Sequence, residues 1–375
     1  MLENNLATGA ARSSEESRKF PCKQCGAGLN FKPGATALEC PYCGYREAIN
    51  VAAEEIREYD LEDALLRLPP TQGWGSERQA MRCDNCGAVT TFEPGQVAGA
   101  CAFCGSSRVS TAGSNANLIR PESLVAFKID RSRAGQLFRD WVKGLWFRPN
   151  DLKHAAQVSK ITGAYLPFWS YDALTVAHWH AEAGWHYYVT ETYEDTDSEG
   201  NRVTRQRQVQ HTRWEWVQGG RQDLFDDELV CGSKGLPEKL ISGACPYNLD
   251  ELMPYDAGFL SGFAAEEYQI DLSEGWDRAR ERMEGAVYSR CAADVPGDTH
   301  RALQVHTAFS NMTFKHLLLP VWIAAYLYRD KSYRFLVNGQ TGRISGEAPI
   351  SWWKVAGAVL AIAIVVLLIV FLRER

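Results

Sequence analysis

The stretch Cys22-Lys23-Gln24-Cys25-Gly26 is followed, fourteen residues after Cys25, by Cys40-Pro41-Tyr42-Cys43-Gly44. The same pattern returns at a constant offset between Cys83 and Cys104, with the same fourteen-residue interval between its two Cys-x-x-Cys pairs. That interval is close to the spacing typical of zinc sites. The eight cysteines of the two copies are Cys22, Cys25, Cys40, Cys43, Cys83, Cys86, Cys101 and Cys104.

Each copy is predicted to be a zinc ribbon. A Cys-x-x-Cys pair followed by Gly forms a tight turn that points two thiolates the same way, since Gly tolerates a positive φ. Two such turns close a tetrahedral cage of four sulfurs, with Phe31 or Phe92 as a small core. Such a closed site holds a structural Zn²⁺ ion rather than a catalytic one. A disulfide framework or redox-active pairs are the alternatives, and a repeated pattern of four pairs disfavours both.

The composition indicates a mostly globular protein with room for more than one domain, because the 375 residues include 12 Trp, 15 Tyr and 15 Phe. Thiols reserved for zinc imply a reducing compartment. The three cysteines outside the repeat, Cys231, Cys245 and Cys291, show no ligand spacing and are expected to be small buried apolar residues.

The C-terminal region differs from the rest of the chain. Val355 to Leu372 is a run of eighteen residues without a polar side chain, and Trp352-Trp353-Lys354 precedes it. As a helix the run would be about 27 Å long, close to the thickness of the hydrocarbon core of a bilayer. The sequence therefore predicts a transmembrane helix over 352–372 and a tail-anchored protein. Since the cysteines require a reducing environment, the ribbons are expected to face the cytoplasm from the inner or plasma membrane.

The predicted fold is multidomain, with two small β zinc ribbons, an α+β body and one C-terminal transmembrane helix. The polar start of the chain lacks the apolar core of a signal peptide and is expected to be a flexible tail. Pro69-Pro70 and a segment rich in Ser, Ala, Gly and Asn mark linkers on which the ribbons are expected to move. The predicted boundaries are a tail at 1–17, ribbons at 18–50 and 81–108, a short helix and linker at 51–80, a linker at 109–117, and the body at 118–350.

Within the body, apolar periodicity predicts strands and helices. Helices are expected at 132–146 and 273–287, the second with Trp276, Ala279, Met283 and Val287 facing inward. Strands are expected at 124–129 and 164–171, and a final hairpin around Asn338–Gly342.

A long hairpin is predicted over 174–217, with an acidic tip at 194–201. In its second arm, alternation places Trp214 and Trp216 on one face and Arg205, Arg207 and Arg213 on the other. The aromatic residues of the body usually indicate a core, but this hairpin is the first candidate for an exposed contact surface.

The two halves of the body are similar in outline. The segment Leu166-Pro167-Phe168-Trp169 in the first half corresponds to Leu319-Pro320-Val321-Trp322 in the second. Each half also carries a strand followed by a helix. This pattern suggests an internal duplication.

Several functional classes lack support in the sequence. The formal net charge is −6 and the ribbons have few Lys and Arg, which disfavours nucleic-acid binding. Neither a phosphate-binding G-x-x-x-x-G-K-S/T loop nor an H-E-x-x-H zinc motif occurs. His178, His180 and His186 are a weak metal-site candidate, because a lone His-x-His in an aromatic strand is more often a packing feature.

The chain resembles bacterial tail-anchored proteins described as TFIIB-type zinc-ribbon proteins. The resemblance rests on the doubled ribbons, on Trp146–Pro149 and Gly163–Trp169, and on the block from Leu317 through Asn338–Arg343 to Glu347. Relatives in this family are often labelled as primosomal protein N′ or replication factor Y helicases, although this sequence lacks a motor. The resemblance implies instead protein partners at a membrane, namely SPFH-domain or phage-shock-type proteins.

The sequence thus leads to a non-enzymatic, membrane-anchored zinc-ribbon adaptor as the first hypothesis. A nucleic-acid-associated factor tethered to the membrane is the alternative. Only the eight ribbon cysteines receive a role, and no catalytic or cofactor-binding residue is assigned.

Overall fold

The structure, a computed structural model, describes residues 20–49, 56–67, 79–92, 101, 103–104, 106–112, 118–149, 157–158, 161–196, 200–329 and 331–373. The predicted tail at 1–17 and most of the predicted linkers lie outside these residues.

The first ribbon is a three-stranded antiparallel sheet in the order β1-β2-β3. Its strands are β1 (Asn30–Phe31), β2 (Ala37–Glu39) and β3 (Arg46–Ala48). Phe31 is buried, as expected, and its ring lies 5.2 Å from that of Phe259 and 6.3 Å from that of Phe263 in the body. Phe31 therefore anchors the ribbon to the body.

The second ribbon is part of the main sheet. It contains β5 (Gln79–Cys83), β6 (Val89–Phe92) and β7 (Val109–Ala112), and β5 pairs with both of the others. The predicted linker at 109–117 thus begins with a strand of the ribbon. Because β6 also pairs with β13 (Ala264–Glu266) of the body, the expectation of a ribbon that moves on linkers is wrong for this module.

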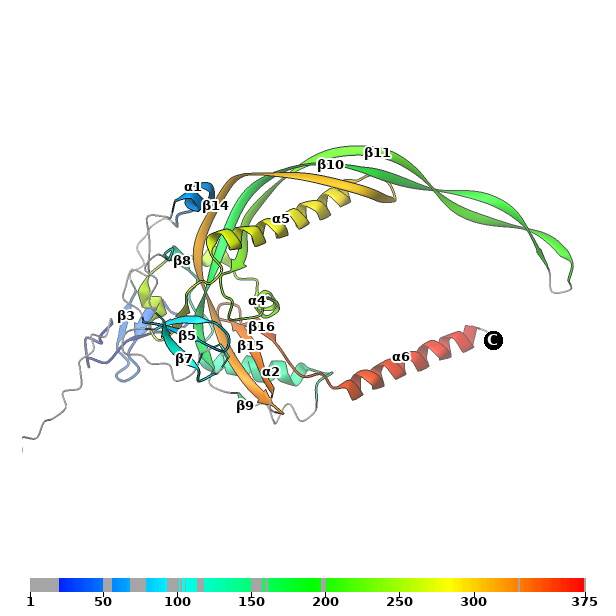
Figure 1. The fold of residues 1–375 in the computed structure, drawn as a ribbon. Coiled ribbons are helices and arrows are strands. Elements are labelled where there is room, and N and C mark those ends of the chain that lie inside the picture. Colours follow the sequence, from blue (N-terminus) through cyan, green and yellow to red (C-terminus); the bar gives the residue numbers. More distant parts are fainter. Residues whose placement is uncertain are drawn as a thin grey trace, which may run out of the picture.

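Thirteen strands of the described residues form the main sheet, and three of these strands are very long. They are β10 (Thr162–Thr196), β11 (Arg202–Cys231) and β14 (Thr299–Tyr328), with β10 antiparallel to both of the others. Figure 1 shows them as an arch that leaves the body. The remaining strands are β4 (Tyr59–Asp60), β8 (Ser123–Leu124), β9 (Gln157–Val158), β12 (Met253–Pro254), β15 (Lys331–Asn338) and β16 (Ile344–Gly346).

The expected strand at 124–129 is only two residues long, as β8. After Leu124 the chain contacts the turn of the hairpin near the end of the body. There the backbone N–H groups of Lys128 and Ile129 both donate to the carbonyl of Gly339. That hairpin, predicted around Asn338–Gly342, is confirmed by the pairing of β15 with β16.

The helices pack on this sheet, and the expected helices at 132–146 and 273–287 are confirmed. Each begins at an aspartate whose carboxylate accepts a hydrogen bond from a backbone N–H of the first turn. The short helix predicted within 51–80 is present at Leu61–Leu66, directly after Tyr59–Asp60, which pairs with β14 as a strand. The helices are α1 (Leu61–Leu66), α2 (Arg131–Gly144), α4 (Glu238–Ala244), α5 (Leu272–Asp294) and α6 (Trp352–Arg373), with 3₁₀ turns η1 (Leu249–Glu251) and η2 (Ala257–Leu260).

Helix α5 covers one face of the arch. Its predicted inward residues Trp276, Ala279, Met283 and Val287 are all buried, and Met283 packs in a cluster with side chains of β10 and β14. In Figure 1, α5 runs along the concave side of the arch.

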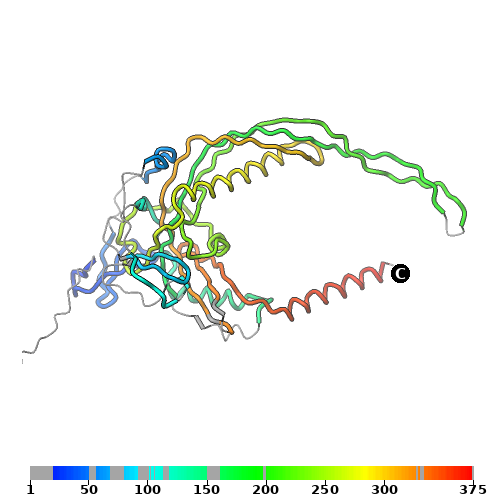
Figure 2. Tube along the Cα trace, viewed as in Figure 1, coloured from blue at the N-terminus to red at the C-terminus, as the bar shows by residue number. Residues whose placement is uncertain are grey.

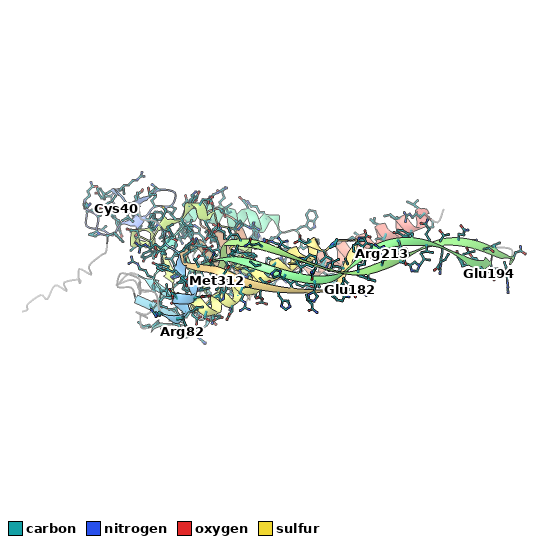
Figure 3. The ribbon with its side chains drawn as sticks, turned by 90° about the horizontal axis from the view of Figure 1, so that it is seen from above. Cys40, Arg82, Glu182, Glu194, Arg213 and Met312 are labelled. Carbon is teal, nitrogen blue, oxygen red and sulfur yellow. The ribbon has the colours of Figure 1, made fainter. Side chains whose placement is uncertain are left out.

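Beyond Gly184, the last residue of β10 paired with β14, the strands β10 and β11 continue as a two-stranded ribbon. The predicted hairpin is therefore present and is longer than expected. Its continuous register places Trp214 and Trp216 on the face opposite Arg213, as predicted. In Figure 3, Glu194 lies near the far end of the ribbon, well away from Met312 and Cys40.

Helix α6 extends away from the body, as the tube in Figure 2 shows. None of its residues is buried. Its most apolar 18-residue window has a mean hydropathy of 3.3, and none of that window is buried. This helix is long and apolar enough to span a membrane.

Candidate metal centres

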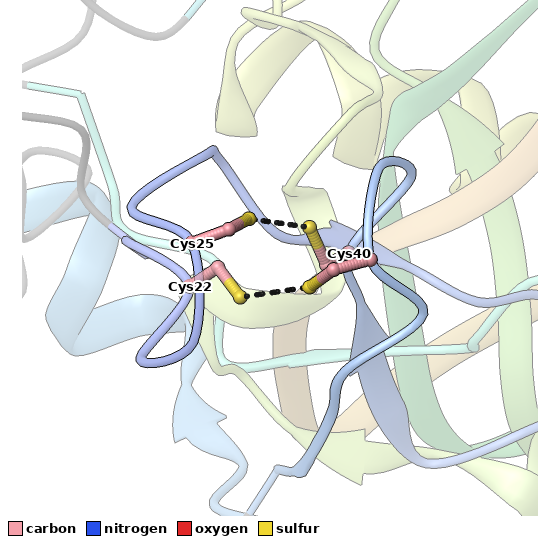
Figure 4. A group of neighbouring side chains, drawn as sticks. Cys22, Cys25 and Cys40 are labelled. Carbon is pink, nitrogen blue, oxygen red and sulfur yellow. Dashed lines mark hydrogen bonds between the residues drawn. The ribbon is translucent and has the colours of Figure 1, made fainter.

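The four cysteines of the first ribbon converge on one point (Figure 4). The Sγ atoms of Cys22 and Cys43 lie 3.5 Å apart, as do those of Cys25 and Cys40. A zinc–sulfur distance of about 2.3 Å gives a tetrahedron with sulfur–sulfur edges of about 3.8 Å. A disulfide would need about 2.05 Å. The spacing thus fits four thiolates around one metal ion.

Two tight turns position these sulfurs. In each, the glycine N–H donates to the carbonyl of the first cysteine, at 2.8 Å for Gly26 to Cys22 and 3.0 Å for Gly44 to Cys40. Both glycines have a positive φ, which a residue with a side chain adopts only with strain. This explains why Gly follows each Cys-x-x-Cys pair.

The second ribbon repeats the arrangement. The Sγ atoms of Cys83 and Cys104 are 3.6 Å apart, and those of Cys86 and Cys101 are 3.7 Å apart. The backbone N–H of Phe103 and the side-chain amide of Asn85 donate to two of these sulfurs, at 3.4 and 3.5 Å. The structure therefore brings together both predicted sets of four cysteines.

The crowded thiols have unequal pKa values. The hydrogen bond from the Cys86 thiol lowers the pKa of Cys101 to about 5, and the same contact raises the pKa of Cys86. In the first ribbon the backbone N–H of Cys43 is the main cause that lowers the pKa of Cys40 to about 6. A divalent cation at the centre would offset half of the charge of four thiolates and hold all four deprotonated together. These sites could thus bind metal ions such as Zn²⁺.

The chain is similar to the uncharacterized protein YdjG of Bacillus subtilis (strain 168). The two are 29% identical over 245 residues, which is 64% of this chain and 66% of YdjG. The match thus spans slightly less than two thirds of the relative. No protein-family model and no solved structure matches the chain.

One short segment of the body holds both ribbons. The Ser261 hydroxyl donates to the carbonyl of Leu29 at 2.6 Å, and the Ser261 carbonyl accepts from the N–H of Phe31 at 3.0 Å. Four residues later, the Thr91 hydroxyl donates to the carbonyl of Ala265 at 3.0 Å. The two metal centres are therefore connected through 257–267.

Glu266 of this segment is fully buried beside the second ribbon. Burial raises its pKa to about 8, and the side-chain amide of Gln269 donates to its Oε1 at 3.0 Å. Sequence reasoning missed this carboxyl, because Glu266-Glu267 has the composition of an exposed loop.

Sequence reasoning also missed an acidic cluster formed by Asp172, Asp226 and Asp227. Lys315 already supplies a cation there, with its Nζ 2.8 Å from both Asp227 and Glu58. Burial raises the pKa of Asp172 to about 6. This cluster is an internal ion-pair network at the bulge between Tyr171 and Ala173.

The other candidates from the sequence form no centre. The His180 ring lies 6.2 Å from that of Trp216, and His186 bonds to the hydroxyl of Thr212 at 3.0 Å. In the described part of the chain, no group of potential metal ligands includes these histidines. Cys291 is buried as expected, whereas Cys231 and Cys245 are only half-buried.

Proposed function

We propose that the chain is a non-enzymatic, membrane-anchored adaptor. In this proposal Zn²⁺ fills both cysteine clusters, α6 spans the inner or plasma membrane, and the rest of the chain faces the cytoplasm. The proposed role is to recruit membrane-associated proteins.

The form of the metal centres supports a structural role for the metal. Each has four cysteine sulfurs, which leaves no coordination position for water or substrate on a tetrahedral ion. Zinc bound in this way contributes to folding, on the order of 10 kcal/mol in small zinc-finger peptides. The ribbons are then rigid attachments to the body.

The observation that carries the adaptor role is the exposed ribbon at the end of the arch. Past Gly184, Tyr187 and Tyr188 of β10 are 50% and 63% exposed, and Trp216 of β11, which pairs with Glu182 just before this point, is 65% exposed. An isolated two-stranded ribbon is only marginally stable in water. Large aromatic side chains on it are typical of protein contact sites. Tyr187 and Tyr188 lie on opposite faces of the ribbon, and we infer that a protein partner contacts both faces there.

The charge of the first ribbon favours a protein partner over nucleic acid. Lys23 pairs with Glu47 at 2.6 Å, while Lys32 and Arg46 both pair with Glu39, at 2.6 and 2.8 Å. Each of these cations is engaged by a carboxylate, whereas phosphate binding depends on cations that release counterions from the nucleic acid. The resemblance in sequence makes SPFH-domain or phage-shock-type proteins the first partners to test.

The test uses the full-length protein in lipid vesicles with a purified SPFH-domain protein. Wild-type vesicles should retain this partner on flotation, and Tyr187→Thr/Tyr188→Thr should reduce the retention at least tenfold. Gln206→Thr/Gln208→Thr, at exposed positions on the neighbouring strand, is the matched control and should bind like the wild type. Equal binding by the tyrosine variant would move the contact elsewhere. Salt-dependent binding of DNA or RNA without partner retention would favour the alternative function.

A further inference from the structure

The loop that follows α2, residues 145–149, lies against the residues that lead into α6 and against its first turn. The backbone N–H of Ser351 donates to the carbonyl of Phe147 at 2.9 Å, and the Arg148 guanidinium donates to the carbonyl of Ala348 at 2.5 Å. The Lys354 ammonium donates to the carbonyl of Trp146 at 3.1 Å. The loop is therefore held against the start of the apolar helix, and Figure 1 shows α2 and α6 meeting there.

A cavity of about 490 Å³ lies at this junction. Three cationic side chains line it, Lys143 and Arg148 from the α2 side and Lys354 from α6. In the part of the chain that the structure describes, no Asp or Glu is among its lining residues. Lys143 also pairs with the exposed Asp140 at 3.1 Å, whereas Arg148 and Lys354 donate to the carbonyls of Ala348 and Trp146.

An exposed Trp ring lines the cavity, and two more lie beside it in the sequence of α6. Trp146 is 81% exposed, and Trp352 and Trp353 in the first turn of α6 are 75% and 90% exposed. Tryptophan concentrates at the level of the lipid headgroups, where its ring contacts acyl chains and its N–H contacts water. An exposed Trp cluster has no such advantage in bulk water.

The position of the cavity along α6 fixes its depth. Lys354 and Ala358, which both line it, lie two and six residues after Trp352. At 1.5 Å per residue, they are about 3 and 9 Å further along the helix. If α6 spans the bilayer, as the proposed function requires, the cations lie at headgroup depth and Ala358 lies near the acyl chains.

We propose that this cavity binds the headgroup of an anionic phospholipid. The phosphate oxygens would accept hydrogen bonds from Arg148, whose planar guanidinium suits two of them, and Lys354 would add a point charge. Trp146 and Trp352 would contact the glycerol and the first acyl carbons. A zwitterionic lipid would bind less well, because its own cation opposes the charge of the cavity.

The test uses full-length protein in nanodiscs with equal amounts of phosphatidylglycerol and phosphatidylcholine of the same chain length. Native mass spectrometry then counts the lipid molecules that stay bound to the protein after its release from the nanodisc. Wild-type protein should retain phosphatidylglycerol in at least fivefold excess, and Arg148→Gln/Lys354→Gln should retain the two lipids equally. The glutamines keep a donor for the carbonyls of Ala348 and Trp146 but remove the charge.

The matched control is Arg131→Gln/Arg133→Gln, which removes two exposed charges at the other end of α2 and should keep the excess. Equal retention by the wild type overturns the proposal, whatever the folding of the variants. It is also overturned if the double variant keeps the excess, or if millimolar inorganic phosphate removes the lipid. Protein that does not insert at all would contradict the membrane anchor itself, whereas inserted protein without lipid preference contradicts this site alone.

Discussion

Leu166 of β10 and Leu319 of β14 lie directly opposite each other in the antiparallel pairing of the two strands. Both are buried, and each opens one of the two similar blocks in the sequence. The two blocks therefore meet at this one pair and extend from it in opposite directions along neighbouring strands. Such a neighbour relation is compatible with an internal duplication, which stays a prediction.

Loss of one ligand should release one metal ion and leave the other. Cys101→Ser removes one of the four sulfurs of the second centre, and three thiolates with one hydroxyl hold zinc poorly. Metal analysis of purified protein should therefore find two zinc ions per chain in the wild type and one in the variant. Cys245→Ser, outside both clusters, should keep two. An unchanged zinc content in Cys101→Ser would contradict the assignment of this residue as a ligand.

Two glycine-to-alanine changes should have opposite effects on stability. Gly219 lies opposite Trp179, and a Cβ there would come within 2.4 Å of the indole ring. Gly219→Ala should therefore cost about 1–3 kcal/mol of unfolding free energy. At Gly285, in the exposed part of α5, an added Cβ would meet no described atom within 4 Å, so Gly285→Ala should stabilise by about 0.5–1 kcal/mol. Chemical denaturation measures the change in unfolding free energy of each variant. If both variants were destabilised to the same extent, packing at Gly219 would not be the cause.

The buried carboxyl of Glu266 should make stability fall as pH rises. Its pKa is raised from 4.5 to about 8 by burial, so the folded protein binds its proton more tightly than the unfolded chain does. Stability from this proton is full below pH 4.5 and is lost as pH rises through about 8. Glu266→Gln has no proton to lose at this position. Its unfolding free energy relative to that of the wild type should therefore increase by on the order of 1 kcal/mol for each pH unit between pH 4.5 and about 8. Parallel pH profiles for the two proteins would refute the buried, protonated carboxyl.

Removal of the Lys315 ammonium should destabilise the base of the arch. The side chain is 7% exposed and pairs with Asp227 and Glu58, whose side chains are 26% and 41% exposed, so Lys315→Met leaves partly exposed carboxylates without a counter-charge. The expected cost is about 1–3 kcal/mol at neutral pH, because water screens these carboxylates in part. The deficit should shrink below pH 6, where Asp172 becomes protonated. Urea titrations at two pH values measure this, with Lys239→Met at an exposed position of α4 as the control. A constant deficit at both pH values would point to lost packing alone.

Local patterns predicted much of the fold. The cysteine spacing identified both clusters, and apolar periodicity found α2 and α5 with the correct inward residues. These features depend on neighbours within a few turns of the chain. The glycine-rich turn at Asn338–Gly342 is of the same kind.

The features that the sequence did not reveal depend on distant partners. Thr91 and Ala265 are 174 positions apart, and nothing in the composition of either segment marks the other as its partner. The same holds for Lys315 and Glu58, which are 257 positions apart. The apparent linker after the second ribbon looked flexible because Ser, Thr and Ala at 109–112 give no strong strand signal without the partner strand β5. Long-range pairing thus makes the second ribbon, predicted to be a mobile module, a part of the main sheet.

The free ribbon beyond Gly184 acts as a lever. From Gly184 to Thr196 it extends about 40 Å at 3.3 Å per residue. A rotation of about 10° at its root would then carry the far end through about 7 Å. β13 pairs with the second ribbon and with Ala164 and Tyr165 of β10, so the strand that carries this lever begins beside one metal centre.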